Sequence, residues 1–247
     1  MCSKGLAMTK LSVNVNKIAT LRNSRGGLEP NLLYLIDKII GYGSHGITIH
    51  PRADQRHITR QDAYDVAKHV KSVETNFEGD LREDFLNMTL ELRPTQCTLV
   101  PVSPGEITSD HGWDVFKNDY ILKPIIAKLK ESGIRVSLFL DAGNVALVEK
   151  AAELGTDRIE IYTEPYAKAF LEGDYKAELA KIKETVDRAS ALGVKCNAGH
   201  DLTYQNLKPL LQSSPEIAEV SIGHYIMAYA LEVGLEKSVK AHLEALK

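Results

Sequence analysis

The stretch Ser132-Gly-Ile-Arg-Val-Ser-Leu-Phe-Leu-Asp141 passes from the end of a helical pattern, through a glycine, into an apolar and β-branched run. A glycine in that place supplies the left-handed cap that ends a helix, and a strand follows within two residues. The same order recurs at Leu154-Gly155 and at Leu192-Gly193. The repeated helix–glycine–strand unit predicts alternating strands and helices, which is typical of parallel sheets.

Eight strands of this kind are expected, separated by helices whose apolar residues recur at helical spacing. We expect strands at residues 11–15, 46–50, 76–78, 97–101, 135–141, 158–162, 194–198 and 219–222. We expect helices at roughly 31–40, 60–73, 81–92, 122–131, 145–154, 176–192, 204–211 and 225–246. In 247 residues this pattern predicts an α/β chain forming a single-domain (β/α)8 TIM barrel with extra helical segments. A doubly wound open sheet is the alternative.

The composition is that of an ordinary globular domain, with 44% hydrophobic and 26% charged residues. A net charge of −3 argues against a general binder of nucleic acid or membrane surfaces. The three cysteines have no Cys-x-x-Cys spacing, no apolar run approaches membrane-spanning length, and the first ten residues lack the apolar core of a signal peptide. We therefore expect a cytoplasmic chain with a loose extension at residues 1–10 and one barrel domain at 11–247.

The run Gly41-Tyr-Gly-Ser-His-Gly46 has the glycine spacing of a dinucleotide-binding fingerprint. That fingerprint needs a strand before it and a helix after it. Here a helical pattern precedes the glycines and a strand pattern follows them. We expect a turn between helix and strand at this place, and no nucleotide site.

Polar and ionisable residues follow nearly every expected strand. In a (β/α)8 barrel the carboxyl ends of the strands form the catalytic face, so these side chains should converge there. They are Asn14, Asn16, Lys17, Arg25, His50, Arg52, Glu78, Thr108, Asp141, Glu160, His200, Asp201, Gly223 and His224. A merely solvated rim would not require such a convergence.

Four of these residues suit proton transfer. Glu160 alternates with isoleucines and should point into the barrel, where it either pairs with an interior Arg or Lys or faces a substrate. Glu78 closes a strand, while His50 and His200 come from strands well apart around the barrel and could act on different ends of one intermediate. Surface positions are expected for the histidines on turns, loops and helix faces: His45, His69, His111 and His242.

Two anion-binding sites are also expected. One consists of Arg52, Arg56 and His57, after the second strand. The other consists of the glycine turns Gly199-His200-Asp201 and Gly223-His224, each leading towards a helix N-terminus. Arg25 could reach either site. Two anion sites fit one bisphosphate or two phosphorylated substrates.

The motifs that carry these residues resemble one known family, pyridoxine 5′-phosphate synthase. They are Val13-Asn-Val-Asn-Lys-Ile-Ala-Thr-Leu-Arg-Asn-Ser-Arg-Gly26, Gly46-Ile-Thr-Ile-His-Pro-Arg-Ala-Asp-Gln-Arg-His-Ile58, Asn76-Phe-Glu78, Leu99-Val-Pro101, Val136-Ser-Leu-Phe-Leu-Asp141, Asn197-Ala-Gly-His-Asp-Leu-Thr-Tyr204 and Ile222-Gly-His224. The resemblance covers nearly the whole chain from residue 11. It implies a barrel that assembles into a homo-octamer and needs neither a metal nor an organic cofactor. It implies condensation of 1-deoxy-D-xylulose 5-phosphate with 3-amino-2-oxopropyl phosphate to pyridoxine 5′-phosphate, phosphate and water.

The resemblance also implies roles for single residues. His50 and Glu78 would accept protons, His200 would donate one, and Glu160 would stabilise the transition state. The holders of the deoxyxylulose phosphate would be Arg52, His57 and Thr108. The holders of the aminoketone phosphate would be Asn14, Arg25, Gly223 and His224.

The chain departs from the family's usual pattern at two places that are expected to touch substrate. Asn16-Lys17 stands where many members have Asp-His, so Lys17 can still attract a phosphate but neutral Asn16 cannot act as a base. Asp201 stands where many members have glycine, and its carboxylate must turn away from a bound phosphate or repel it.

Two other functions stay open from the sequence. The first is a metal-dependent sugar-phosphate aldolase or isomerase with His50, Glu78, Glu160 and His200 as ligands, although no His-x-His or His-x-x-x-His spacing occurs. The second is a catalytically silent barrel that binds phosphate ligands. Such a barrel would gain thermal stability from a ligand and show no turnover.

Overall fold

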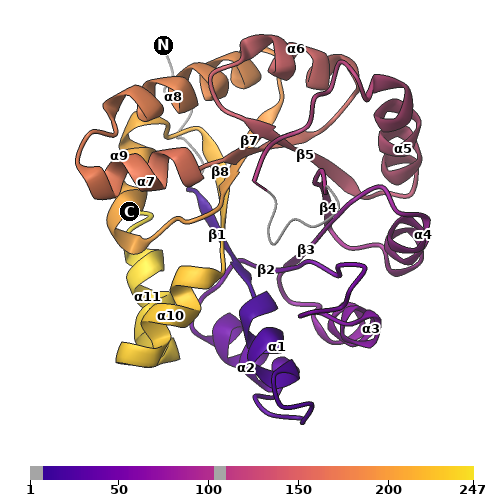
Figure 1. Cartoon of the computed structure of the whole chain (residues 1–247), viewed down its shortest axis with the longest axis vertical. Coiled ribbons are helices and arrows are strands. Elements are labelled where there is room, and N and C mark those ends of the chain that lie inside the picture. Colours follow the sequence, from indigo (N-terminus) through magenta and orange to yellow (C-terminus); the bar gives the residue numbers. More distant parts are fainter. Residues whose placement is uncertain (1–7, 103–109) are drawn as a thin grey trace.

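The computed structural model describes residues 8–102 and 110–247. Within these ranges eight parallel strands close into one barrel in sequence order, with helices around the outside (Figure 1). The strands are β1 (Lys10–Asn14), β2 (Gly46–Ile49), β3 (Glu74–Gly79), β4 (Gln96–Leu99), β5 (Arg135–Asp141), β6 (Arg158–Tyr162), β7 (Lys195–Gly199) and β8 (Ile217–Ile222). Because β1 pairs with both β2 and β8, the sheet is closed and the open-sheet alternative is excluded. The predicted (β/α)8 barrel is confirmed.

The helices of the described ranges form the outer layer and the strand-to-strand connections. They are α1 (Asn16–Asn23), α2 (Leu32–Gly41), α3 (Arg60–His69), α4 (Glu83–Leu92), α5 (Asp119–Glu131), α6 (Val145–Glu153), α7 (Glu164–Glu172), α8 (Lys176–Ala191), α9 (Tyr204–Ser213), α10 (His224–Val233) and α11 (Leu235–Glu244). None of them is long and apolar enough to cross a membrane.

Three details of the helices differ from the prediction. The helices α1 and α7 were not predicted, because each buries only two side chains and so gives a weak periodic signal. The single helix expected at 225–246 is two helices, since Gly234 adopts φ +87° and ends α10. Finally, α5 begins at Asp119, three residues before the expected start, and contains Pro124.

The glycine-rich run after α2 is a turn, as predicted. Gly41 ends α2 and Gly46 begins β2. A Cβ at Gly46 would lie 3.1 Å from Oγ of Ser12 and 3.2 Å from the carbonyl oxygen of Glu74. Glycine therefore allows β2 to lie closely between its two neighbouring strands.

The interior of the barrel has two polar levels. Near the strand starts, Arg158 donates to Asn197 Oδ1 at 2.8 Å and lies 3.3 Å from Glu219, while Arg135 pairs with Glu74. Near the strand ends, Glu78, Glu160 and His50 are buried or line a cavity. The ion pairs Arg158–Glu219 and Arg135–Glu74 thus occupy the interior of the barrel at the end where the strands start.

Candidate active site

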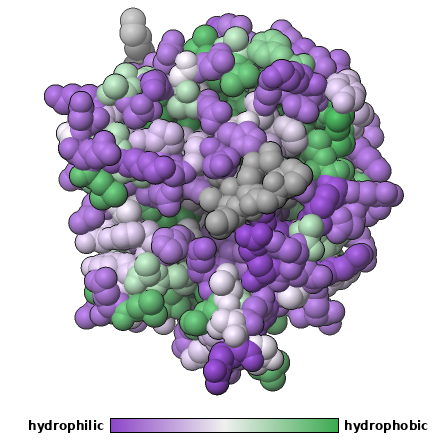
Figure 2. Space-filling view, in the orientation of Figure 1, coloured by the Kyte–Doolittle hydropathy of each residue, from purple (hydrophilic) through white to green (hydrophobic). Residues whose placement is uncertain are grey.

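A cavity of about 420 Å³ opens among the carboxyl ends of the strands. It brings together twelve of the fourteen residues that were assigned a catalytic or substrate-binding role from the sequence: Asn14, Asn16, Lys17, His50, Arg52, His57, Glu78, Glu160, His200, Asp201, Gly223 and His224. Figure 2 shows strongly hydrophilic side chains close to the centre of the face that Figure 1 presents. Arg25 is exposed in the connection after α1 and does not line the cavity. Thr108 lies outside the described residues.

Glu78 and His50 form the central pair of the cavity, with Oε2 of Glu78 3.9 Å from Nδ1 of His50. Burial raises the pKa of Glu78 to about 7, although the nearby His200 opposes the rise. Burial also lowers the pKa of His50 to about 3, and the positive charges of neighbouring side chains lower it further. His50 is therefore neutral at pH 7, and Glu78 exchanges its proton in the range where an acid–base catalyst is most effective.

Two uncharged groups hold the Glu78 carboxylate. Asn14 donates from Nδ2 to Oε2 at 3.4 Å, and Ser221 donates from Oγ to Oε1 at 3.5 Å. Neither neutralises a negative charge as a cation would. The carboxyl group can therefore gain or lose a proton without breaking an ion pair.

Glu160 points into the barrel, as predicted, and is almost completely buried. Its described hydrogen-bond partner is Oγ1 of Thr98 at 3.4 Å, and the interior Arg158 pairs with Glu219 instead. Burial, with the charges of Glu78 and Glu219, raises the pKa of Glu160 well above its usual value. The raised pKa favours the protonated carboxyl group, which is the form that can donate a hydrogen bond into the cavity.

The residue next to the Glu160 side chain on the neighbouring strand is Gly199, and its small size has a steric reason. A Cβ on Gly199, the last residue of β7, would collide with Oε1 of Glu160. Because Gly199 has no side chain, there is room for the Glu160 carboxyl group between β6 and β7.

The loop after β2 carries the residues that were predicted to form one of the two anion sites. His57 accepts a hydrogen bond at Nδ1 from the backbone N–H of Ile58, at 2.9 Å. Burial, followed by the charges of Arg52 and Lys17, lowers the pKa of His57 to about 4. The neutral ring must then carry its proton on Nε2, so the cavity has one N–H donor and two cations at this end. Arg56 also lines the cavity, while its guanidinium pairs with Asp54.

Asn16 uses its side chain to position other parts of the site. Its Oδ1 accepts the backbone N–H of His50 at 3.0 Å, and its own backbone N–H donates to Oδ1 of Asn14 at 3.0 Å. These two bonds fasten the end of β2 to the end of β1. Asn16 also lines the cavity, where its amide NH2 group can donate to a substrate.

The residues predicted for the second anion site lie at the N-terminus of α10. Gly223 precedes the helix and His224 is its first residue, and N–H groups in the first turn of a helix have no partner within it. A Cβ on Gly223 would lie 2.9 Å from both Cβ and the carbonyl oxygen of Asn14. Glycine therefore lets the helix begin directly against the end of β1.

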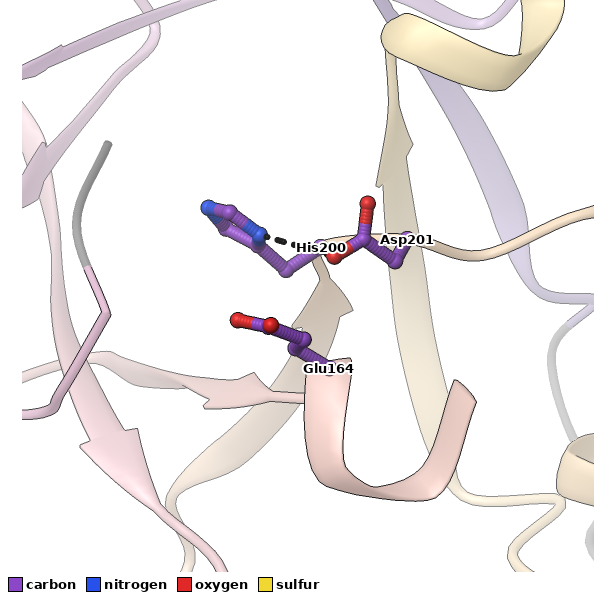
Figure 3. A group of neighbouring side chains, drawn as sticks. All are labelled: Glu164, His200 and Asp201. Atoms are coloured by element: carbon purple, nitrogen blue, oxygen red, sulfur yellow. Dashed lines mark hydrogen bonds and ion pairs between the residues drawn. The ribbon is translucent and has the colours of Figure 1, made fainter. Parts of the chain in front are cut away.

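His200 lies beside two carboxylates, those of Glu164 and Asp201 (Figure 3). Nδ1 of His200 is 3.5 Å from Oδ2 of Asp201. The potential ligand atoms of the three residues all lie within 4.8 Å of one another, so this group could hold a metal ion. Within the described ranges, the four-residue set required by a metal-dependent aldolase does not form such a group.

The sequence prediction missed several contributors to the site. Ser221 could have been found, because it alternates with buried Val220 and so shares the inward face of β8 with Glu219. Glu164 was missed together with α7, and Arg82 gave no signal, although its charge helps to lower the pKa of His50. His242, predicted at the surface, is fully buried beside the rings of Tyr204 and Tyr225, so that prediction was wrong.

Comparison with known sequences gives one consistent result. A family model described as pyridoxal phosphate biosynthesis protein PdxJ matches residues 11–247. A pyridoxine 5′-phosphate synthase from Christiangramia forsetii is 47% identical over 240 residues, covering 97% of this chain and 100% of that protein. A pyridoxine 5′-phosphate synthase from Leptospira biflexa is 45% identical over 255 residues, covering 97% of both chains.

Solved structures with the same architecture have very different sequences. A tryptophan synthase structure from M. tuberculosis matches with a TM-score of 0.65 at 9% identity, over 97% of this chain and 94% of that chain. A phosphoribosylanthranilate isomerase from Thermotoga maritima matches with a TM-score of 0.58 at 13% identity, over 97% and 98%. Identities this low show a shared fold and nothing about the reaction.

Proposed function

This chain belongs to the PdxJ family of pyridoxal phosphate biosynthesis proteins and is an enzyme of pyridoxine 5′-phosphate synthesis, and we propose that it condenses 1-deoxy-D-xylulose 5-phosphate with 3-amino-2-oxopropyl phosphate. The products are pyridoxine 5′-phosphate, phosphate and water. One observation carries the proposal about the substrates. The pair Glu78–His50 lies in a cavity that is lined by Arg52 and His57 of the loop after β2 and by the N-terminus of α10.

Each anion site would hold the phosphate of one substrate. Arg52 and His57, with Lys17 and Thr108, would bind the deoxyxylulose phosphate. The start of α10 at Gly223 and His224, with Asn14, would bind the aminoketone phosphate. The reacting carbonyl and amino groups would then meet between the two sites, which supplies the orientation that a condensation needs.

The proton transfers follow from the charge states of the site. Imine formation, dehydration, phosphate loss and ring closure each move protons at a carbonyl, imine or enol, and none of them changes an oxidation state through a redox centre. Neutral His50 and deprotonated Glu78 would accept protons from carbon or nitrogen. Protonated Glu160 would donate a hydrogen bond to the developing negative charge, and His200 would donate a proton to a departing oxygen.

The remaining expectations belong to the same proposal. Asn16 positions His50 and offers its NH2 group to substrate, while Asp201 lies at the edge of the aminoketone site. The chain acts as one barrel domain over residues 11–247 in the cytoplasm, as a homo-oligomer of the octameric kind that the resemblance implies. It needs no metal or organic cofactor.

Two matched variants test the assignment of the phosphates. A hydrogen bond to a charged group contributes ~1.5–3 kcal/mol, so losing one should raise KM by about tenfold or more. We expect His57→Ala to raise KM for deoxyxylulose phosphate and His224→Ala to raise KM for the aminoketone phosphate. The measurement is steady-state product formation with each substrate varied in turn.

A control for these variants is His69→Ala, since His69 is exposed and pairs with Asp37 away from the cavity. It should leave both KM values unchanged. The assignment fails if His57→Ala and His224→Ala raise the same KM.

A further inference from the structure

The two groups proposed to accept protons lie at the ends of neighbouring strands. β2 and β3 are paired with Ile49 opposite Phe77, and His50 and Glu78 are the next residues of the two strands (Figure 1). Their side chains come within 3.9 Å of each other, measured from Nδ1 to Oε2. The next residue after His50 is Pro51, which has no backbone N–H to continue the ladder. The distance between the two groups therefore depends on what holds the segment His50–Pro51 in place.

Two side chains from neighbouring loops hold this segment, one at each end. Oδ1 of Asn16 accepts the backbone N–H of His50 at 3.0 Å, and Nη2 of Arg82 donates to the carbonyl oxygen of Pro51 at 2.9 Å. Pro51 is buried, and a buried carbonyl oxygen that lacks a donor costs free energy. Arg82 therefore provides from the loop after β3 what Asn16 provides from the end of β1.

The guanidinium group of Arg82 is itself fixed by two carboxylates. Its Nε donates to Oδ1 of Asp80 at 2.6 Å, and its Nη1 lies 3.1 Å from Oδ2 of Asp84. Asp80 directly follows β3, the strand that carries Glu78. Because an arginine presents its N–H groups in a rigid planar fork, partners on several sides fix the direction of the group. Arg82 thus connects the end of β2 to the end of β3.

We propose that Arg82 is a positioning residue, which holds His50 beside Glu78 through the carbonyl oxygen of Pro51. This inference rests on the proposed function, in which His50 and Glu78 accept protons. Arg82 does not line the cavity, so it acts through the backbone and not on the substrates. A shift of Pro51 would move the imidazole of the preceding residue away from its place beside the carboxyl group.

The contacts of Arg82 argue against a role confined to the start of α4. The residue directly precedes this helix, but its side chain makes no capping hydrogen bond to it. The carboxylate of Asp84 is 61% exposed, and ion pairs with exposed groups add little stability. The bond to Pro51, by contrast, joins residues 31 positions apart in the sequence. Loss of Arg82 should therefore reduce catalysis more than stability.

The test is steady-state product formation by Arg82→Met, with each substrate varied in turn. A misplacement of about 1 Å can cost about 10²-fold in rate, so we expect kcat to fall by about 10- to 100-fold. The KM for deoxyxylulose phosphate should rise as well, because Arg52 follows Pro51 directly. The KM for the aminoketone phosphate should stay within about twofold of the wild-type value, since its proposed site follows β8.

The matched control is the same substitution at Arg60, the exposed first residue of α3, whose guanidinium lies over the ring of Tyr64. Arg60→Met should leave kcat and both KM values unchanged. A kcat of Arg82→Met within about twofold of the wild-type value would overturn the proposal. An equal rise of both KM values would also overturn it, because a defect of the whole barrel produces that result.

A second variant covers a failure of Arg82→Met to fold. Arg82→Lys keeps a positive charge between Asp80 and Asp84, so the fold should be retained. Its single ammonium group cannot reproduce the fork that reaches both carboxylates and Pro51. We expect a kcat between those of the wild type and Arg82→Met, with the same difference between the two KM values. A wild-type kcat in Arg82→Lys would show that the charge is sufficient and that the bond to Pro51 holds nothing.

Hydrogen exchange separates this inference from the proposed function, because it needs no turnover. In the full-length protein, peptides that cover residues 50–58 should exchange about tenfold faster in Arg82→Met than in the wild type, and at the wild-type rate in Arg60→Met. Peptides from β5 to β7 should exchange equally in all three proteins. Unchanged exchange at residues 50–58 overturns the inference even if the wild type makes the product. A wild type without product contradicts the proposed function, while the exchange still decides whether Arg82 holds this segment.

Discussion

Glu78→Gln should lower kcat by ~10²–10⁴, the range that one well-placed general acid–base group contributes. Glutamine keeps the size of the side chain and can still bond to Asn14 and Ser221, so the cavity keeps its shape. The substitution removes the carboxyl group of Glu78, whose pKa is raised to about 7 by burial. The loss should therefore fall on kcat much more than on either KM.

The pH dependence checks the assignment of that rate loss. As a base, Glu78 acts in its ionised form, so the wild-type rate should rise with pH through about 7, and this limb should be absent in Glu78→Gln. Glu131→Gln, an exposed change at the end of α5, is the matched control and should keep the wild-type profile. A Glu78→Gln enzyme with near wild-type kcat would contradict the role.

Stability gives a second check on the same variant. The pKa of Glu78 is raised in the folded chain, so the folded state holds a proton that the unfolded state has lost between about pH 4.5 and 7. This contribution to stability is lost as pH rises to 7. Glutamine has no charge to desolvate, so at pH 8 Glu78→Gln should unfold at the same urea concentration as the wild type or a higher one. Lost activity could not then be attributed to unfolding.

Arg158→Met should lower the free energy of unfolding by ~3–5 kcal/mol at pH 7, the cost of leaving one partner of a buried pair without the other. Arg158 is buried at the start of β6, where it bonds to Asn197 and lies 3.3 Å from Oε2 of Glu219. Burial already raises the pKa of Glu219, and Arg158 is the main group that opposes this rise. Without Arg158 the Glu219 carboxylate must stay buried with less compensation or take up a proton.

Urea unfolding across pH measures this effect. The deficit of Arg158→Met should shrink as pH falls, because burial raises the pKa of Glu219 and the carboxylate takes up a proton in the folded variant. The double variant Arg158→Met/Glu219→Gln should recover part of the stability, since neither charge of the buried pair then remains. A loss below about 1 kcal/mol that does not depend on pH would show that the pair does not hold this end of the barrel.

The strands could be predicted because their signals are local. Glycines 133, 155 and 193 each end a helix with positive φ, and a strand follows each of them. The catalytic face followed from the rule that it forms at the carboxyl ends of the strands, and this rule alone predicted that His50, Glu78 and His200 would meet. Local spacing and one rule of topology were sufficient for these parts.

Other features depend on contacts between distant segments and left no local signal. The carboxylate of Glu164 reaches His200 only because α7 starts beside the end of β7. The raised pKa of Glu160 depends on burial and on Glu78 and Glu219 from two other strands. His242 is buried by Tyr204 and Tyr225, which come from α9 and α10, so its position within α11 could not reveal its burial.

The most direct test of the account is 31P NMR of the wild-type enzyme with both phosphorylated substrates and an excess of chelator. We predict that pyridoxine 5′-phosphate and inorganic phosphate appear in equal amounts, and that neither forms when one substrate is omitted. Phosphate or product released from a single substrate, or a reaction that the chelator stops, would contradict a two-substrate condensation by the acid–base groups of this cavity.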